Sequence, residues 1–170
     1  AGEVVVALGP WSPDVLRPLG YRVPMAVKRG YHQHFALRDG AALTRPVADV
    51  DSGFVVSPMT LGLRLTTGAE LAYVDAPRTP NQIEAAERIA RQSFPLGARV
   101  EREPWMGTRP CMPDMKPVFG PVPAVPGMWC AFGHGHQGFT LGPASGRLIA
   151  EMISRETPYV DPRPYSPQRF

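Results

Sequence analysis

The chain has 170 residues, of which 44% are hydrophobic and 19% are charged, so the composition indicates a folded globular protein rather than a disordered one. No apolar run approaches the roughly 20 residues that a membrane-spanning helix needs. Arginines dominate the net charge of +3 but are scattered along the sequence, so we expect no nucleic-acid-binding face.

The first half of the chain predicts one strand, one short helix and an antiparallel sheet. Residues 3–8 form a continuous apolar run, which is typical of a buried parallel strand. A short helix follows, with Ser12 as N-cap, Pro13 in the first helical position and Gly20 as terminator. Residues 21–73 alternate β-prone runs with turn residues, which predicts an antiparallel sheet. Its covered face would include Leu61, Leu63, Leu65, Leu71 and Tyr73.

The second half predicts two helices separated by a proline-rich loop. In the first helix Thr79 is the expected cap, Pro80 takes the first position and Gln82 completes a capping box. Its apolar face would hold Ile83, Ala86, Ile89, Ala90 and Phe94. Residues 103–127 predict an ordered loop with one short strand at 117–120. The remaining predicted elements are a strand at 128–132, a turn at 133–138, a helix at 141–154 and an irregular proline-rich tail.

The turn at residues 133–138 reads GHGHQG and so matches the G-x-G-x-x-G spacing of dinucleotide-binding turns. A complete dinucleotide unit also needs a second strand after the helix, with an acidic residue at its end. Glu151 and Glu156 fall on or just past the helix, which argues against a self-contained NAD enzyme. The glycines still let backbone N–H groups approach an electron-rich ligand at the positive end of a helix. A tight strand–helix connection without a ligand is the alternative.

The histidines and cysteines give no metal-binding signature. His32 and His34, like His134 and His136, lack a carboxylate or thiol at ligand spacing, so we expect no metal site. Cys111 and Cys130 are far apart in the sequence and lack C-x-x-C spacing. We expect buried, reduced thiols in a cytoplasmic protein, and a disulfide between the two stays an open alternative.

Five segments, in this order, resemble the FAD-dependent D-amino-acid oxidase/dehydrogenase superfamily: VVVALGPWS, VPMAVKRGYHQ, FVVSPMTLGLRLTTGAEL, WMGTRPCMPDMKPVFGPVP and WCAFGHGHQGFTLGPASGRLIAEMI. The resemblance covers about residues 3–154 and is strongest to the bacterial D-amino-acid dehydrogenases. It implies an α+β fold in which residues 21–116 form a substrate-binding lobe with an antiparallel or mixed sheet and a helix. Residues 1–20 and 117–170 would be the C-terminal strand, loop and helix of an FAD-binding lobe. The family's N-terminal dinucleotide-binding unit has no counterpart here, so we expect this chain to be the second part of a longer protein.

The resemblance also implies the site residues. Arg109 matches the family's carboxylate anchor, because a guanidinium can bind both oxygens of a carboxylate; a surface ion pair is the alternative. The substrate would also contact Tyr31, His32, His34 and His136. The cofactor FAD would contact Gly9, Trp11, Gly107, Gly133, His134, Gly135, His136, Gln137, Gly138, Phe139 and Thr140. No residue stands out as a general base.

The implied activity is oxidation of the Cα–N bond of D-amino acids, or of related secondary amino acids, by hydride transfer to FAD. The implied partners are a small amino-acid substrate and the missing dinucleotide-binding part. A quinone acceptor would add peripheral association with the inner face of a membrane. The 170 residues alone are expected to hold FAD weakly or not at all. The alternative function is a non-catalytic binding or assembly module of a larger complex.

Overall fold

The computed structural model describes residues 2–38, 41–123 and 125–170, and the chain divides into two compact units. Unit 1 comprises Ala1–Lys28 and Thr108–Phe170, and unit 2 comprises Arg29–Gly107. The units therefore separate at different residues from the expected lobes at 21–116 and at 1–20 with 117–170. One consequence matters for the site, because Arg109 belongs to the same unit as the glycine turn.

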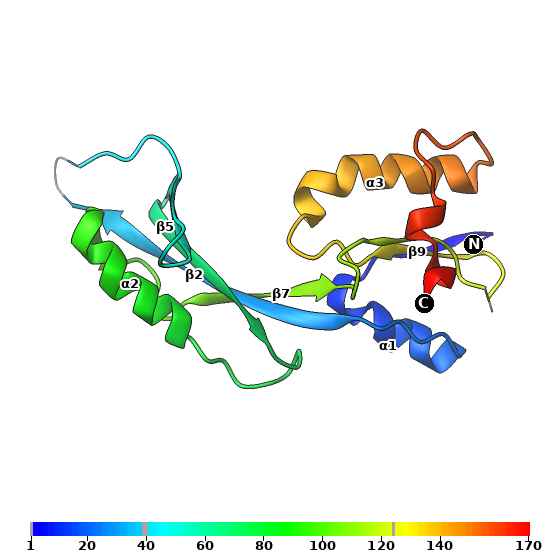
Figure 1. Ribbon diagram of the computed structural model, residues 1–170, viewed down its shortest axis with the longest axis horizontal. Helices are drawn as coiled ribbons and strands as arrows, with labels where there is room; N and C mark the ends of the chain where they lie inside the picture. Colours follow the sequence, from blue (N-terminus) through cyan, green and yellow to red (C-terminus); the bar gives the residue numbers. More distant parts are fainter. Residues whose placement is uncertain (1, 39–40, 124) are drawn as a thin grey trace. The chain divides into compact units, whose positions relative to one another are not determined.

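Unit 1 is built on a three-stranded sheet of β1 (Val4–Val6), β9 (Met128–Phe132) and β8 (Val118–Pro121), in the order β1-β9-β8. The predicted first strand is confirmed: β1 pairs with β9 in parallel, whereas β8 pairs with β9 antiparallel (Figure 1). The expectation that β1 is buried is wrong for Val4 and Val5, which are 47% and 40% exposed, and correct for Val6.

The helices of unit 1 differ from the predictions at their first turns. A 3-10 turn, η1 (Gly9–Trp11), leads into α1 (Ser12–Leu16), so Trp11 rather than Ser12 holds the cap position. Another 3-10 turn, η2 (Arg17–Leu19), ends at Gly20, the predicted terminator, whose backbone is left-handed. The helix α3 (Gly138–Ile153) begins three residues earlier than expected. The tail forms two short 3-10 turns, η3 (Arg163–Tyr165) and η4 (Pro167–Arg169).

Unit 2 contains the predicted sheet, whose strands run in the order β3-β4-β5-β2-β6, with β7 also pairing with β2. The strands are β2 (Ala26–Leu37), β3 (Val47–Asp49), β4 (Phe54–Met59), β5 (Gly62–Leu71), β6 (Leu96–Arg99) and β7 (Trp105–Cys111). The pairs β3–β4, β4–β5 and β2–β6 are antiparallel. β6 was not predicted, and β7 occupies part of the segment expected to be a loop.

The helix α2 (Asn81–Ser93) covers one face of this sheet and closes the core of unit 2 (Figure 1). The core contains Tyr31, Phe35, Phe54, Val56, Leu63, Leu65, Ile83, Ala86, Ala90 and Leu96. Leu61, Leu71, Tyr73 and Ile89, which were expected on covered faces, are exposed. On α2 the buried residue that was not predicted is Glu87, next to Ala86. Its two carboxylate oxygens accept hydrogen bonds from Arg91 and Arg99.

The predicted capping box of α2 is wrong. Pro80 stands at the cap position, and no side chain among the described residues caps this helix. The hydroxyl of Thr79 donates to the carboxylate of Glu70 instead, and its N–H donates to the hydroxyl of Tyr31 at 2.9 Å. The charge-assisted hydrogen bond fixes the Thr79 side chain on the carboxylate of Glu70, and this side chain makes no capping hydrogen bond to α2.

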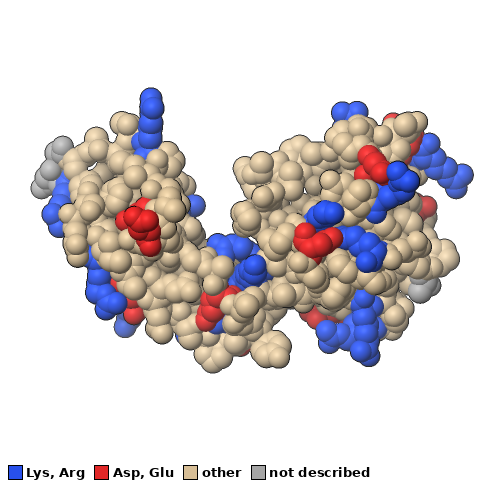
Figure 2. Space-filling model, viewed as in Figure 1, with Lys and Arg blue, Asp and Glu red and all other residues tan. Residues whose placement is uncertain are grey.

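Taken together, the elements give the expected α+β fold with a mixed sheet in unit 1 and a largely antiparallel one in unit 2. Figure 2 shows Lys and Arg interspersed with Asp and Glu over the visible face of each unit, as on an ordinary solvated surface. Among the described residues, no helix is long and apolar enough to span a membrane.

Candidate active site

The glycine turn joins β9 to α3, as the sequence predicts, and two of its glycines have left-handed backbones. Gly133 has a φ of 85° and Gly135 a φ of 59°. A Cβ atom on Gly133 would also lie 2.8 Å from the Cγ atom of Met112. Larger residues would be strained at both positions. Gly138, by contrast, is the first residue of α3.

The backbone beside Arg109 holds this turn in place. The N–H of Gly135 donates to the carbonyl oxygen of Pro110 at 2.8 Å, and Cys111 forms an antiparallel bridge with His134. Arg109 itself is half-buried on β7. The two motifs that the sequence singles out, the arginine block and the glycine turn, are therefore brought together within unit 1.

A cavity of about 500 Å³ lies beside the turn, between the strands β1 and β9 and the helix α3. Three of the five residues that α3 contributes to its wall are glycines, because Gly138, Gly142 and Gly146 follow one another at helical spacing. The described atoms leave open space where a Cβ would stand on Gly142 or Gly146. The rest of the lining is small or apolar and comprises Val5, Ala7, Gly9, Pro110, Ala131, Phe132, His134, Gly135, Ser145 and Ile149.

The N-terminus of α3 is exposed at the mouth of the turn. His136, Gln137, Gly138, Phe139 and Thr140 are all exposed, and Phe139 is fully so. The last three were expected in a loop but form the first helical turn, where N–H groups lack partners within the helix. Gln137 holds the cap position, and its carbonyl oxygen accepts the N–H of Leu141. This end of α3 is thus a set of N–H donors at the positive end of a dipole.

Because α3 starts early, Pro143 lies inside the helix rather than in its first turn. Proline has no N–H, so the carbonyl oxygen four residues before it, on Phe139, lacks its helical partner. Pro143 therefore costs α3 one backbone hydrogen bond.

His134 is the one histidine of the turn that is anchored. Its Nε2 lies 2.9 Å from the Oγ of Ser145, and its ring meets Phe119 edge to face. Burial lowers the pKa of His134, so the ring is neutral at neutral pH. His136 is exposed beside it.

Three other cofactor-contact predictions lie at distinct places. Gly9 has a φ of 55° and lines the cavity opposite Pro110. Trp11 is 55% exposed on η1. Gly107 makes room for the ring of Trp105, since a Cβ there would lie 2.2 Å from a ring carbon. The close approach at Gly107 is therefore one within unit 2.

In unit 2 the predicted substrate-lining residues of β2 do not share one face. Tyr31 lies in the core beneath α2, and its hydroxyl donates to Glu70 at 3.0 Å. His32 and His34 point to the opposite face, as alternation along a strand requires. There His32 stacks on Trp105, with ring centroids 4.7 Å apart. Tyr31 is thus separated from the other two.

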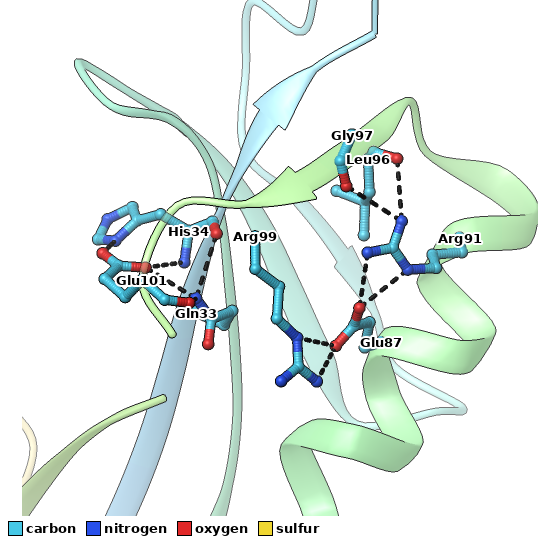
Figure 3. Close-up of polar contacts among 8 residues, drawn as sticks. All are labelled: Gln33, His34, Glu87, Arg91, Leu96, Gly97, Arg99 and Glu101. Atoms are coloured by element: carbon cyan, nitrogen blue, oxygen red, sulfur yellow. Dashed lines mark hydrogen bonds and ion pairs between the residues drawn. The ribbon is translucent and has the colours of Figure 1, made fainter. Parts of the chain in front are cut away.

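Two charged residues on this face were not predicted from the sequence. The Nδ1 of His34 lies 2.5 Å from an oxygen of Glu101, and Arg64 Nε donates to His34 Nε2 at 3.0 Å (Figure 3 shows the Glu101 contact). Arg64 stands between the buried Leu63 and Leu65, and that alternation could have placed it on the open face. Nothing in the sequence around Glu101 signals its role.

Both cysteines are buried, as expected, and each is a free thiol in the described part of the chain. Burial raises the pKa of Cys130 to about 12, which keeps this thiol protonated and unreactive.

Comparisons with known proteins identify the family of the chain. The family model described as "DAO: FAD dependent oxidoreductase" matches residues 1–152. The chain is 33% identical to a glycine oxidase of Pseudomonas aeruginosa over 97% of its own length and 45% of that protein's. It is also 33% identical to a D-amino acid dehydrogenase of Methylobacterium nodulans, covering 100% of this chain and 41% of the relative.

Among solved structures, the iminodiacetate oxidase of Chelativorans sp. BNC1 is similar, with a TM-score of 0.76 and 26% identity. The match covers 98% of this chain and 46% of that one, so the chain spans less than half the length of these relatives. With a family match over most of its length, the chain belongs to the DAO family of FAD-dependent oxidoreductases.

Proposed function

We propose that the protein containing this chain oxidises the Cα–N bond of an amino acid with FAD as electron acceptor. The observation that carries the proposal is the hydrogen bond from Gly135 to Pro110, which joins the glycine turn to the backbone next to Arg109. Relatives named as glycine oxidase, D-amino acid dehydrogenase and iminodiacetate oxidase support an amino-acid substrate. D-amino acids or related secondary amino acids are the substrates we favour.

The residues around the cavity fit a flavin. A flat, aromatic ring system needs a surface that side chains do not block, and Gly142 and Gly146 of α3 leave open space at the cavity. Gly9, Gly135 and the first turn of α3 would hold the cofactor, which supplies the electron acceptor when bound. The exposed N–H groups at Gly138, Phe139 and Thr140 would donate to its electron-rich edge, where the helix dipole also favours negative charge.

Arg109 is the residue we assign to the substrate carboxylate. A guanidinium forms two parallel, charge-assisted hydrogen bonds to a carboxylate and so fixes the amino acid in one orientation. Pro110, next to it, fixes the backbone against the glycine turn. The substrate would lose a hydride from Cα, and the resulting imine would be hydrolysed to a keto acid and ammonia. No side chain of this chain is assigned as a general base.

The test replaces Arg109 by Leu in the complete protein. Because two charge-assisted hydrogen bonds are removed, we expect kcat/KM for amino acids to fall by about 100-fold or more while flavin content is unchanged. Arg109→Lys should recover part of the activity, and the exposed Arg102→Leu is the matched control. Activity towards D-amino acids, glycine, sarcosine and proline is measured with oxygen and with a quinone analogue.

Unchanged turnover in Arg109→Leu would show that the anchor is elsewhere. A flavin-loaded protein that oxidises none of these compounds would overturn the proposed function and favour a non-catalytic role.

A further inference from the structure

Unit 1 contains a second cavity that the proposed reaction does not use. Its volume is about 280 Å³, and it borders the face of α3 that carries Leu141, Ala144 and Leu148 at helical spacing. Every residue that lines it belongs to unit 1, so one compact unit forms the whole cavity. The part of the lining that matters below comprises Lys116, Phe119, His134, Ala144, Tyr159 and Tyr165.

This second cavity is distinct from the one beside the glycine turn. His134 and Ser145 line both cavities, and the hydrogen bond between His134 Nε2 and Ser145 Oγ, at 2.9 Å, lies in the wall that the two cavities share. The other lining residues of the two cavities differ. A molecule in the second cavity would therefore be a neighbour of the proposed flavin site without occupying it.

The C-terminal tail closes one side of the second cavity and is held there by long-range hydrogen bonds. The hydroxyl of Tyr159 donates to the carbonyl oxygen of Ala144 on α3 at 3.2 Å. At the end of the tail, the guanidinium of Arg169 donates to the carboxylate of Asp114 at 2.9 Å and to the carbonyl oxygen of Lys116 at 2.7 Å. The tail is thus bound both to the helix and to the loop before β8, so the cavity has fixed walls.

Aromatic rings form the inner part of the second cavity. Phe119 on β8 is buried and lines it. The ring of His134 meets Phe119 edge to face with centroids 5.5 Å apart, and the ring of Tyr165 does the same at 5.8 Å. Aromatic rings prefer this geometry, so the ring of a ligand can join the group in the same way. The volume lies near the lower end of small-molecule pockets, which suits a ligand with a single ring.

The charge of the lining is positive. Lys116 lines the second cavity, whereas no Asp or Glu of the described residues does. Burial lowers the pKa of His134 and keeps its ring neutral, so the charge of the lining is that of Lys116. Within residues 2–38, 41–123 and 125–170, the ammonium of Lys116 has no hydrogen bond or ion pair, and the carboxylate of Asp114 pairs with Arg169 instead.

We propose that the second cavity binds a small aromatic carboxylate. The ring of the ligand would pack against Phe119 and Tyr165, and its carboxylate would pair with the ammonium of Lys116. An anion suits this lining because it meets a cation without a partner and no carboxylate that would repel it. The inference does not use Arg109 and stands independently of the proposed function.

Calorimetric titration with benzoate tests the proposal in the complete protein carrying Arg109→Leu, a background that removes the carboxylate anchor assigned to the substrate. Because a charge-assisted contact is lost, adding Lys116→Gln should weaken benzoate binding at least about tenfold. Lys116→Arg keeps the charge, so binding should stay within about threefold of the background. Lys28→Gln, which changes the other lysine of the chain, lies outside the lining and should leave binding unchanged.

A second variant tests the second cavity while keeping Lys116. Ala144→Leu adds a larger side chain to the wall on α3 and should also weaken benzoate binding at least about tenfold, because it fills the space that the ring needs. Leucine is a good helix former, so the unfolding temperature should hardly change. Ala150→Leu, at an exposed position of the same helix outside the lining, is the matched control and should leave binding unchanged.

Further probes separate the ring from the charge. Acetate has the charge without the ring, benzyl alcohol has the ring without the charge, and benzylamine has the opposite charge. Each should bind at least about tenfold more weakly than benzoate.

Benzoate binding that is absent from the Arg109→Leu background, or that is unaffected by Lys116→Gln or by Ala144→Leu, overturns the proposal. Benzylamine that binds as tightly as benzoate overturns it as well. None of these titrations requires turnover, so they decide the second cavity whether or not the protein oxidises amino acids.

Discussion

Individual glycines of the turn serve different physical purposes, although the sequence presents them as one motif. Gly133 and Gly135 need left-handed backbones, whereas Gly138 begins a helix with ordinary geometry. Gly142 and Gly146 have open space beside them and serve the cavity. The spelling G-x-G-x-x-G therefore arises from turn geometry and not from a complete nucleotide-binding unit.

We expect Gly133→Ala to destabilise the protein by about 1–3 kcal/mol, because a Cβ atom is strained at a positive φ and would collide with Met112. Gly142→Ala is the matched control, since alanine stabilises a helix interior by up to about 1 kcal/mol. The same control should lower flavin content, because its methyl group enters the cavity. Thermal unfolding and the flavin-to-protein ratio measure both effects. A Gly133→Ala protein as stable as the parent would contradict this view of the turn.

The two predicted helix caps show that local sequence alone does not determine which residue caps a helix. The sequence pattern around Ser12 and Thr79 predicts caps, yet Ser12 lies inside α1 and Thr79 binds Glu70. The two errors have different causes. Ser12 loses the cap position because the 3-10 turn before it moves the cap to Trp11. Thr79 is misjudged because a cap prediction considers only neighbours in sequence, whereas its hydroxyl donates to the distant carboxylate of Glu70.

At the scale of elements, α2 is joined to β6 by one buried carboxylate. Glu87 on the helix accepts two hydrogen bonds from Arg91, at 2.9 and 2.7 Å, and two from Arg99 on β6 (Figure 3). Arg91 also donates to the carbonyl oxygens of Leu96 and Gly97, both at 3.1 Å. The helix and the edge strand are thus held together by charge as well as by apolar packing.

We predict that Glu87→Gln destabilises the protein by about 1–3 kcal/mol at neutral pH, because two half-buried arginines lose their shared acceptor. Burial alone would raise the pKa of Glu87, but hydrogen bonds and charges of Arg99 and Arg91 hold it below 4.5. A carboxyl group whose pKa is lower in the folded than in the unfolded protein stabilises the fold at pH values above its unfolded pKa. This stabilisation is lost as the pH falls through the folded pKa.

The difference between wild type and Glu87→Gln should therefore shrink below about pH 4.5. Unfolding temperatures measured at neutral and acid pH provide the check. Glu84→Gln, on the exposed face of the same helix, is the control and should change stability little at either pH. A stability difference between the two proteins that is the same at low and neutral pH would mean that the charge of Glu87 does not stabilise the fold.

The elements that sequence patterns predict well are those whose residues repeat at one period. β5 shows its alternation, α2 its helical spacing and β9 its apolar run, and all three are found. β7 was not predicted because Gly107 and Pro110 interrupt the residue pattern of a strand. Pro110 is tolerated in this strand, where its carbonyl oxygen accepts a hydrogen bond from the N–H of Gly135. The start of α3 was missed because Gly138 and Thr140 are weak helix formers.

For the molecule as a whole, the sequence predicts the turn and the arginine block but not the contacts of His34 with Arg64 and Glu101 in unit 2. The turn and the block are motifs that are continuous in the chain. Arg64, His34 and Glu101 are about 30 to 70 residues apart in the sequence and come together only in the folded sheet. Long-range pairs of this kind leave no local sequence pattern, so they can be identified only from the fold.

We predict that the purified 170-residue chain retains little FAD. The cavity beside α3 offers backbone donors to one side of a flavin, but the described residues contain no second strand after α3 that could complete a dinucleotide-binding unit. Flavin absorbance after gel filtration of the chain, loaded with excess FAD, gives the answer. The complete protein treated in the same way is the positive control. One equivalent of flavin retained by the chain alone would refute this expectation.

The strand β1 has a consequence for how this chain behaves in solution. It pairs with β9 along one side only in the part of the chain that is described, and Val4 and Val5 are exposed on it. A row of open N–H and C=O groups flanked by valines is a template on which another strand can add. In the isolated chain, the same edge is where molecules would begin to aggregate as concentration rises.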